Sequence, residues 1–436
     1  MSRTGSLSLL ELIAQPRTLE QAWHSVRSSS SASSSGLDNI TLSAFARAWP
    51  QQKKQLREQL LAKSFTFTPY RGQPIRKRSN ADPRILKDWR PISIATVRDR
   101  VVQRAILNRI WKDIRDKVHT EVSFGGVRRY KLTPRSHKCP VEDDSQRCVR
   151  SAAQRIIGLR KRGHCYLFET DIENFFPSIN RQRLFEDLFP MLRDNSINHL
   201  IEAALDTSIA NARELGQLAG LWDPTTGVPQ GGTLSPVIAN FYLFEHDKEL
   251  VDSGFHPVRY VDDLIVLTRS KQEACSAYRI CKSALDRIGL KIHPIGKESN
   301  GRIKTNIRGP GEPFDFLGLT FTAHTIRPMR SKFDSLRERL QQITDADGGK
   351  EVLVDVIKKI NWCVRGWVKA YCFCNLGPGE LRDIDNQVGF FVRRWLVRRN
   401  IIARANKLDN QAYRWLGIER AQDIFIHPIL KRRPSR

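Results

Sequence analysis

The chain has 436 residues, a formal net charge of +26 and a pI near 10.1. A hydrophobic content of 40% argues against a disordered polypeptide, and no apolar run is long enough to span a bilayer, which argues against an integral membrane protein. The positive excess is spread along the whole sequence and favours a polyanionic partner, with binding that weakens steeply as salt rises.

Apolar periodicity predicts helices in the N-terminal third of the chain. They cover residues 1–27, 42–63 and 99–118, and a serine tract over 28–35 predicts a flexible loop between the first two. Residues 64–98 alternate and contain prolines, which is typical of short strands crossed by basic residues. The polar, basic stretch 126–150 predicts an exposed loop, and helix and strand patterns then alternate to about residue 326.

The pattern beyond residue 328 is helical and lacks strand signals. Its clearest helices cover residues 352–371 and 383–399. The second of these helices carries a basic cluster: Arg393, Arg394, Arg398 and Arg399. Four tryptophans interleave with basic residues here, and most of their rings are expected in the core: Trp362, Trp367, Trp395 and Trp415. The sequence therefore predicts two domains, 1–325 and 326–436, the second being helical and contacting nucleic acid with its basic face.

The eight cysteines show neither disulfide spacing nor a four-ligand zinc pattern. Cys139, Cys148 and His137 lie in the predicted loop, and Cys372 and Cys374 lie in a predicted helix. No secretory signal is apparent at the N-terminus, so a reduced, cytoplasmic protein that does not enter membranes is expected.

Paired carboxylates carry the strongest chemical signal. Asp262 and Asp263 sit at the tip of a predicted β-hairpin, and Asp171 ends another short apolar strand. An isolated Asp-Asp pair is more often a plain turn, because Asp side chains bond nearby backbone amides. If the two tips converge, three like charges share a small volume and require cations. Two Mg²⁺ ions, roughly 3.5–4 Å apart, are the usual solution and perform phosphoryl chemistry.

Further residues around these acids suit a nucleotide site. The carbonyl of Ile172 offers another oxygen ligand for a hard cation, and Phe176 is placed to pack against a nucleotide sugar. Gly231 and Gly232 allow close backbone approach to a ligand, with Gln230 at their edge. Ser235 and Pro236 then predict the start of a helix.

These residues, taken in order, resemble the reverse transcriptase family, and closely its bacterial branch related to group II intron proteins. The resemblance rests on an ordered series of segments: 36–38, 90–92, 99–103, 123–125, Asp171 with 175–176, 229–240, 260–263, 289–297 and 316–318. Four departures narrow the branch. Val261 replaces the usual alanine, Pro177 replaces a second Asp of intron enzymes, the spacing from Lys77 to Arg90 is long, and 307–310 lacks the valine-threonine-glycine triplet of retron enzymes.

The resemblance implies an α+β right-hand polymerase, with fingers and palm over 1–325 and an α-helical thumb over 326–436. Asp171, Asp262 and Asp263 would be catalytic and, with Ile172, would hold two Mg²⁺ ions, for which Mn²⁺ substitutes. Nucleotide contacts would come from Lys77 or Lys87, Arg90, Phe176, Gln230 and Lys297. Primer and template contacts would come from Gly231, Gly232, Tyr260, Phe316 and Gly318. For each side chain a plain structural role is the alternative.

No Cys/His-rich endonuclease module follows the helical region, so the chain is similar to the standalone defence-associated reverse transcriptases, type 2 in particular. This resemblance implies RNA-directed DNA synthesis from dNTPs on a structured non-coding RNA, with complementary DNA as product and anti-phage defence as the role. The alternatives are an intron or retron reverse transcriptase, and a splicing cofactor with a vestigial polymerase site.

Overall fold

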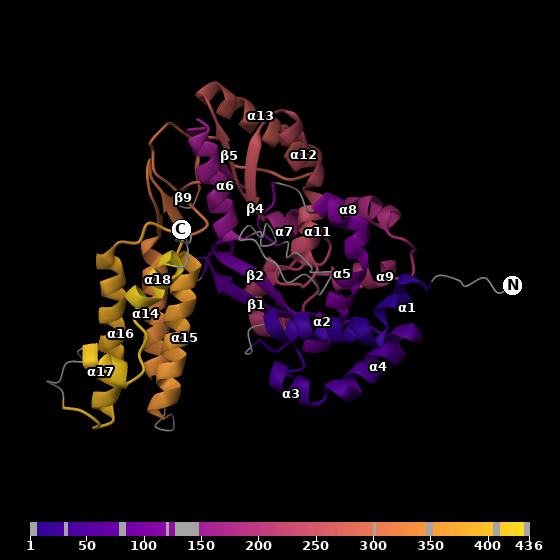
Figure 1. Cartoon of the computed structure of the whole chain (residues 1–436). Coiled ribbons are helices and arrows are strands. Elements are labelled where there is room, and N and C mark those ends of the chain that lie inside the picture. Colours follow the sequence, from indigo (N-terminus) through magenta and orange to yellow (C-terminus); the bar gives the residue numbers. More distant parts are fainter. Residues whose placement is uncertain are drawn as a thin grey trace, which may run out of the picture. The chain divides into compact units, whose positions relative to one another are not determined.

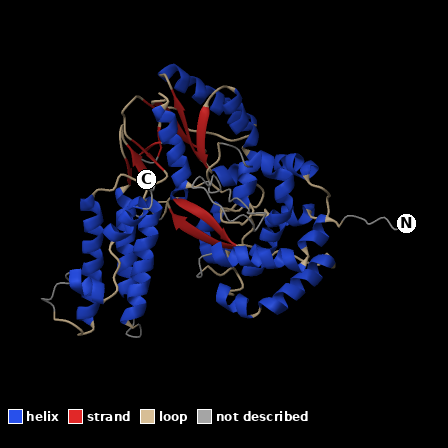
Figure 2. Cartoon of the chain, viewed as in Figure 1, coloured by secondary structure: helices blue, strands red, loops and turns tan. Residues whose placement is uncertain are grey.

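The computed structural model describes residues 7–29, 34–77, 84–118, 122–126, 148–299, 302–345, 352–403 and 410–430. Figures 1 and 2 show helices together with short, mainly antiparallel strands, which confirms the predicted α+β class. The chain forms two compact units, Met1–Arg308 and Gly309–Arg436. The predicted domain boundary at 325/326 falls inside the second unit, and the assignment of thumb and polymerase domain stays a prediction. No helix of the described residues combines the length and the apolarity needed to cross a membrane.

Four helices build the N-terminal region: α1 (Leu9–Ile13), α2 (Pro16–Ser29), α3 (Leu42–Arg47) and α4 (Trp49–Leu61). Two predicted helices are thus each divided in two, and proline lies at each new start. Pro16 is the first residue of α2 and Pro50 lies in the first turn of α4, positions where the missing N–H costs no hydrogen bond. Ser8 caps α1 by accepting from the Glu11 amide at 3.3 Å.

Helix α5 (Val97–Val118) runs through the first unit and confirms the prediction for 99–118. Its apolar face is fully buried, including Val102, Ile106 and Ile110, and packs against α1, α2 and α11 (Ser235–Tyr242). Beside it, β1 (Arg71–Arg76) and β2 (Trp89–Ile94) form an antiparallel pair. The predicted loop 126–150 lies mostly outside the described residues, as do His137 and Cys139.

A four-stranded sheet holds the residues of interest. Its strands, in the order β4-β5-β3-β8, are β4 (His256–Tyr260), β5 (Asp263–Thr268), β3 (Tyr166–Asp171) and β8 (Asn306–Arg308). Strand β5 is buried from Leu264 to Thr268, which explains its unbroken apolar sequence. Helices α6 (Val149–Lys161), α12 (Phe244–Asp252) and α13 (Lys271–Arg287) contact this sheet (Figure 1).

The remaining short elements of the first unit connect these parts. They are η1 (Leu86–Asp88), α7 (Phe175–Ser178), α8 (Arg181–Leu188), η2 (Phe189–Met191), α9 (Asn198–Ala204), α10 (Ala212–Leu215), η3 (Gly216–Leu221), β6 (Glu298–Ser299) and β7 (Arg302–Ile303).

The second unit begins with a three-stranded antiparallel sheet, β9 (Phe314–Phe316), β10 (Leu319–Phe321) and β11 (Ile326–Pro328). Five helices follow: α14 (Arg330–Asp345), α15 (Leu353–Tyr371), α16 (Pro378–Arg398), α17 (Asn410–Trp415) and α18 (Ala421–Leu430). The expected burial of the tryptophans is only half right. Trp395 is buried and Trp367 is half-buried, whereas Trp362 and Trp415 are exposed.

Candidate active site

The structure brings the three predicted carboxylates together through strand register. Asp171 is the last residue of β3 and lies directly opposite Asp263, the first residue of β5. Asp263 also pairs with Tyr260 of β4, so that Val261 and Asp262 form a two-residue hairpin turn. The amide of Ile172 donates to the carbonyl oxygen of Asp262 at 3.2 Å and ties the two strand ends to each other.

The backbone of this turn is strained at Val261. Its φ is +62°, in the left-handed region that β-branched residues rarely adopt. Such a conformation costs on the order of 1–3 kcal/mol and persists only where surrounding contacts impose it. The turn must therefore be held from outside.

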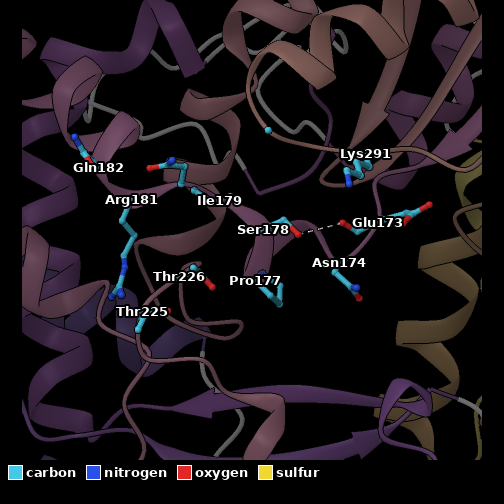
Figure 3. A pocket seen from close by; sticks show the side chains of 12 residues that line it. Glu173, Asn174, Pro177, Ser178, Ile179, Arg181, Gln182, Thr225, Thr226 and Lys291 are labelled. Carbon is cyan, nitrogen blue, oxygen red and sulfur yellow. Dashed lines mark hydrogen bonds between the residues drawn. The ribbon is translucent and has the colours of Figure 1, made fainter.

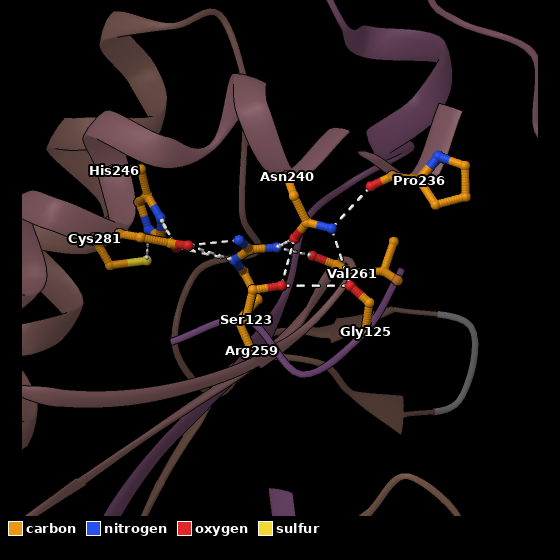
Figure 4. A network of polar contacts seen from close by, with 9 residues as sticks. Ser123, Gly125, Pro236, Asn240, His246, Arg259, Val261 and Cys281 are labelled. Carbon is orange, nitrogen blue, oxygen red and sulfur yellow. Dashed lines mark hydrogen bonds and ion pairs between the residues drawn. The ribbon is translucent and has the colours of Figure 1, made fainter. Parts of the chain in front are cut away.

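A buried polar network supplies that hold (Figure 4). Arg259 Nη1 donates to the carbonyl oxygen of Val261 at 2.9 Å and to Asn240 Oδ1 at 3.0 Å. Arg259 Nε donates to Asp247 Oδ1 at 2.9 Å, and both side chains of this ion pair are 1% exposed. Removing either partner would leave an uncompensated buried charge. The ion pair therefore holds the Arg259 guanidinium in place next to the turn.

The network also reaches residues 123–125, whose sequence pattern carried part of the resemblance. Asn240 accepts from Ser123 Oγ at 2.5 Å and donates to the Gly125 carbonyl at 2.9 Å. A Cβ at Gly125 would come within 2.8 Å of the Tyr260 ring and 3.0 Å of the Val261 nitrogen. Glycine is needed here because the backbone lies directly against the hairpin.

The surroundings raise the pKa of two of the three carboxylates. Asp263 is exposed at the start of β5, yet the surrounding protein desolvates its carboxylate. This desolvation, with the negative charges of Asp262 and Asp171, raises the pKa of Asp263 to about 7. Desolvation, with the charge of Asp171, also raises the pKa of Asp262. Asp171 Oδ1 is buried and has no hydrogen-bond partner among the described residues.

These residues fit a divalent cation. Carboxylate oxygens are the ligands that hard cations prefer, and the buried Asp171 Oδ1, which has no donor among the described residues, is an acceptor suited to such a cation. Among the described side chains, no three His, Cys, Asp or Glu already converge closely enough to hold a metal. Ile172 is buried and bridges to Ile292, and the role of its carbonyl as a ligand stays a prediction.

Lys304 is a residue that the sequence analysis missed. Its ammonium forms an ion pair with Asp171 Oδ2, and the neighbouring Thr305 shares a 2.8 Å hydrogen bond with Thr170 of β3. The predicted Lys297 is exposed in a turn, and no ion pair joins it to a described carboxylate. Both lysines lie in the same basic stretch of sequence. Only the pairing of β8 with β3 shows that Lys304, rather than Lys297, lies next to Asp171.

The predicted nucleotide cations lie near the carboxylates. Lys77 follows β1, and Arg90 lies opposite Ile75 in β2. Desolvation, with the charges of Arg90 and Lys304, lowers the pKa of Lys77, which groups these three cations at one place. The side chain of Lys87 lies outside the described residues.

The glycine-rich segment is clamped between two other elements. The Ser93 amide donates to the Gln230 carbonyl at 2.7 Å, and a Cβ at Gly231 would meet Ser93 oxygen at 2.8 Å. The Val228 amide donates to the Phe176 carbonyl at 2.9 Å. Phe176 itself is half-buried and packs on Phe175, with ring centroids 5.3 Å apart. The segment thus connects the β1–β2 pair to the turn that follows Asp171, with Gly232 at its end.

A polar cavity of about 700 Å³ adjoins this turn (Figure 3). Its wall includes Glu173, Arg181, Thr225 and Lys291, and none of the predicted site residues lines it. Glu173 Oε1 lies 2.9 Å from His293 Nδ1. The cavity therefore lies next to the candidate site without being part of it.

The other predicted contacts belong to the second unit. Phe316 is buried, and Gly318 has φ +77° in the turn from β9 to β10. Of the four arginines of the basic cluster at the end of α16, Arg394 and Arg398 already pair with Asp345, at 3.4 and 2.6 Å. Arg399 stacks over the Trp395 ring at 4.5 Å. The primer, template and RNA roles of all these residues stay predictions.

Several known proteins are similar in sequence to this chain. Residues 75–321 match the family "Reverse transcriptase (RNA-dependent DNA polymerase)". The chain is 25% identical to Protein YkfC of Escherichia coli (strain K12), over 56% of each chain. It is 28% identical to the group II intron-encoded protein LtrA of Lactococcus lactis subsp. cremoris, over 68% of this chain and 42% of that protein.

A third relative is the retron Ec86 reverse transcriptase of Escherichia coli, 26% identical over 42% of this chain and 50% of that protein. The chain thus spans about half the length of the curated relatives it matches. The family match covers more than half of this chain and includes every strand of the sheet that carries the three carboxylates. The chain therefore belongs to the reverse transcriptase family of RNA-dependent DNA polymerases.

Proposed function

We propose that this protein is an RNA-directed DNA polymerase that copies a structured non-coding RNA into complementary DNA. The observation that carries the proposal is the register that sets Asp171 opposite Asp263, with Asp262 in the adjoining turn. Three cations grouped near these acids, Lys77, Arg90 and Lys304, complete a site of mixed charge suited to a triphosphate and its metal ions.

In the proposed mechanism, Asp171, Asp262 and Asp263 would hold two divalent cations, which would lower the pKa of the primer 3′-hydroxyl and stabilise the negative charge of the leaving pyrophosphate. The chain's own residues do the remaining work. Lys77 and Arg90 bind the phosphates, whose negative charge grows in the transition state. Phe176 packs under the sugar and selects deoxynucleotides. Lys304, released from Asp171, becomes available to the leaving pyrophosphate as a hydrogen-bond donor.

A primer-extension assay with an RNA template, dNTPs and Mg²⁺ tests the activity. We expect the wild-type protein to extend the primer and the double variant Asp262→Asn, Asp263→Asn to be inactive. Asp252→Asn is the matched control, because Asp252 is an exposed acid at the end of α12. Wild-type protein that binds primed RNA but never extends it would leave only the splicing-cofactor alternative.

The proposed role is anti-phage defence, which rests on the resemblance to standalone defence enzymes. The similarity to LtrA and to the retron Ec86 enzyme supports a second candidate, an intron or retron reverse transcriptase. Sequencing the RNA and DNA that co-purify with the protein separates the two. One abundant structured RNA with its complementary DNA supports the first, and intron RNA supports the second.

A further inference from the structure

Two tryptophans of the second unit face solvent to an unusual degree. Trp362 on α15 is 77% exposed and Trp415 at the end of α17 is 79% exposed, more than any other large hydrophobic side chain in the described residues. Trp23, Trp49, Trp111, Trp222 and Trp395 are all buried. Since tryptophan is normally placed in cores and interfaces, these two rings require an explanation.

Trp362 belongs to the polar face of α15 rather than to its apolar face. The buried face is formed by Ile357, Ile360 and Val364, and the helix is strongly amphipathic in sequence. Exposed residues at helical spacing surround the ring on the other side: Lys358, Arg365, Gly366 and Lys369. Trp362 thus lies on a face of α15 that also carries the basic residues Lys358, Arg365 and Lys369.

The surface of α15 is open one turn after Trp362. A Cβ added at Gly366 would meet nothing within 4 Å. Glycine inside an exposed helix costs roughly 0.5–1 kcal/mol relative to alanine, so its presence is not explained by helix stability. It leaves backbone accessible one turn from Trp362, which suits close approach by a ligand.

Trp415 is held close to this helix by its neighbours in sequence. Asn361, next to Trp362, donates to the Gly417 carbonyl at 2.7 Å and accepts from the Glu419 amide at 2.9 Å. Arg365 Nε also donates to Glu419 Oε2 at 2.9 Å. These bonds fix the segment just after Trp415 against the middle of α15.

The orientation of Trp415 follows from α17 itself. Tyr413 is 8% exposed, and its hydroxyl donates to the Asp385 carbonyl at 2.6 Å, which anchors α17 on α16. Two residues further along a helix, a side chain points to nearly the opposite side. Trp415 is therefore directed away from the core by the contact that holds the helix, and the exposed Arg414 adjoins it.

We infer that Trp362 and Trp415 form a stacking platform for unpaired bases of single-stranded RNA. Flat aromatic rings with cations around them bind single strands, because every base has a π face and the backbone phosphates are attracted to Lys and Arg. Lys358 and Arg365 are paired with Asp355 and Glu419, so the net positive charge beside the rings comes from the exposed Lys369 and Arg414. The inference deepens the proposed function, on which it rests, by assigning single-stranded segments of the RNA to these rings.

Fluorescence anisotropy with labelled single-stranded oligo(rA) tests the platform on the full chain. We expect Trp362→Ala and Trp415→Ala each to weaken binding about 5- to 150-fold, and Trp→Phe at either position to retain most of the affinity. The salt dependence of binding should stay unchanged, since no charge is removed. Phe390→Ala, which removes a 52% exposed aromatic ring from α16, is the matched control and should bind as wild type.

Two results would overturn the inference. One is an affinity for oligo(rA) that differs less than twofold between wild type and the double alanine variant. The other is an unchanged affinity together with loss of self-association in sedimentation, which would make the rings a protein interface. The Asp262→Asn, Asp263→Asn variant separates this test from that of the polymerase, because its oligo(rA) binding should equal that of the wild type.

Discussion

Arg259 donates a hydrogen bond from inside the core to the carbonyl oxygen of Val261, 2.9 Å away, in the turn between β4 and β5. The same guanidinium is paired with the buried Asp247. Support for the strained turn thus comes from a charge pair that has no access to solvent, and the stability of the protein and the geometry of its site depend on the same contact.

Replacing Asp247 with Asn should lower the free energy of unfolding by about 3–5 kcal/mol, because the Arg259 charge would remain buried without its partner. Chemical denaturation measures the loss. Asp286→Asn is the control: it breaks the exposed pair with Lys282 and should cost less than about 1 kcal/mol. Equal losses in both variants would show that burial of the Asp247 pair does not matter.

Asp263 predicts a particular pH dependence of stability. Its pKa is raised to about 7 in the folded chain, against about 4 in the unfolded chain. Between those values the unfolded chain loses its proton first, so this group makes the protein less stable as pH rises from about 4 to about 7. Asp263→Asn removes the titration. The variant should melt above the wild type at about pH 8, and the difference should shrink toward about pH 4.

Differential scanning fluorimetry across that pH range measures the difference in melting temperature. Asp252→Asn serves as control, since Asp252 lies outside the carboxylate cluster. A constant offset between Asp263→Asn and wild type at all pH values would contradict the explanation, because it would not follow the titration of the carboxylate.

Lys304 and Lys297 should respond differently to Mg²⁺. Lys304 forms an ion pair with Asp171, so Lys304→Gln removes a positive charge from beside the three acids. A bound cation should then stabilise the folded protein more strongly. We expect a larger Mg²⁺-induced rise in melting temperature for Lys304→Gln than for wild type. Lys297→Gln should behave as wild type, and a matching rise in that variant would contradict the placement of Lys304.

The α16 arginines should differ in their contribution to RNA binding. Arg394 and Arg398 are already paired with Asp345, so their replacement by Gln should change the slope of log affinity against log salt only weakly. Replacing Arg393 by Gln should reduce that slope by about one unit. Filter binding at several salt concentrations compares the Arg393 variant with the Arg394 and Arg398 variants, and identical slopes would show that the Asp345 pairs do not matter.

Much of the candidate site is predictable from sequence because its residues are adjacent to strand ends. Alternating and apolar runs before Asp171 and around Asp262 predict strands whose tips carry acids. The segment 123–125 is recognisable as a pattern, but its purpose depends on Asn240 and Arg259 meeting it in space. The sequence contains both lysines of the 297–304 stretch, yet only the register of β8 on β3 decides between them.

The helices show a similar division. Proline is disfavoured inside a helix, so Pro16 and Pro50 indicate the two helix breaks, although the apolar periodicity continues across them. Trp362 and Trp415 are exceptions to the expectation that a tryptophan near basic residues lies in the core. The exposure of Trp362 follows from the inward packing of the opposite face of α15. The exposure of Trp415 depends on the contact of Tyr413 with α16, a partner distant in sequence.

Strand β3 lies between β5 and β8, and both partners follow it in the sequence. During synthesis on the ribosome, the apolar strand that ends in Asp171 emerges well before β5 (Asp263–Thr268) and β8 (Asn306–Arg308) exist to cover its two edges. Contacts this distant in sequence form slowly, and an uncovered strand edge invites pairing with other chains. The nascent protein thus exposes the edges of β3 to other chains until β5 and β8 have been made, and its yield in cells should depend on chaperones acting over that interval.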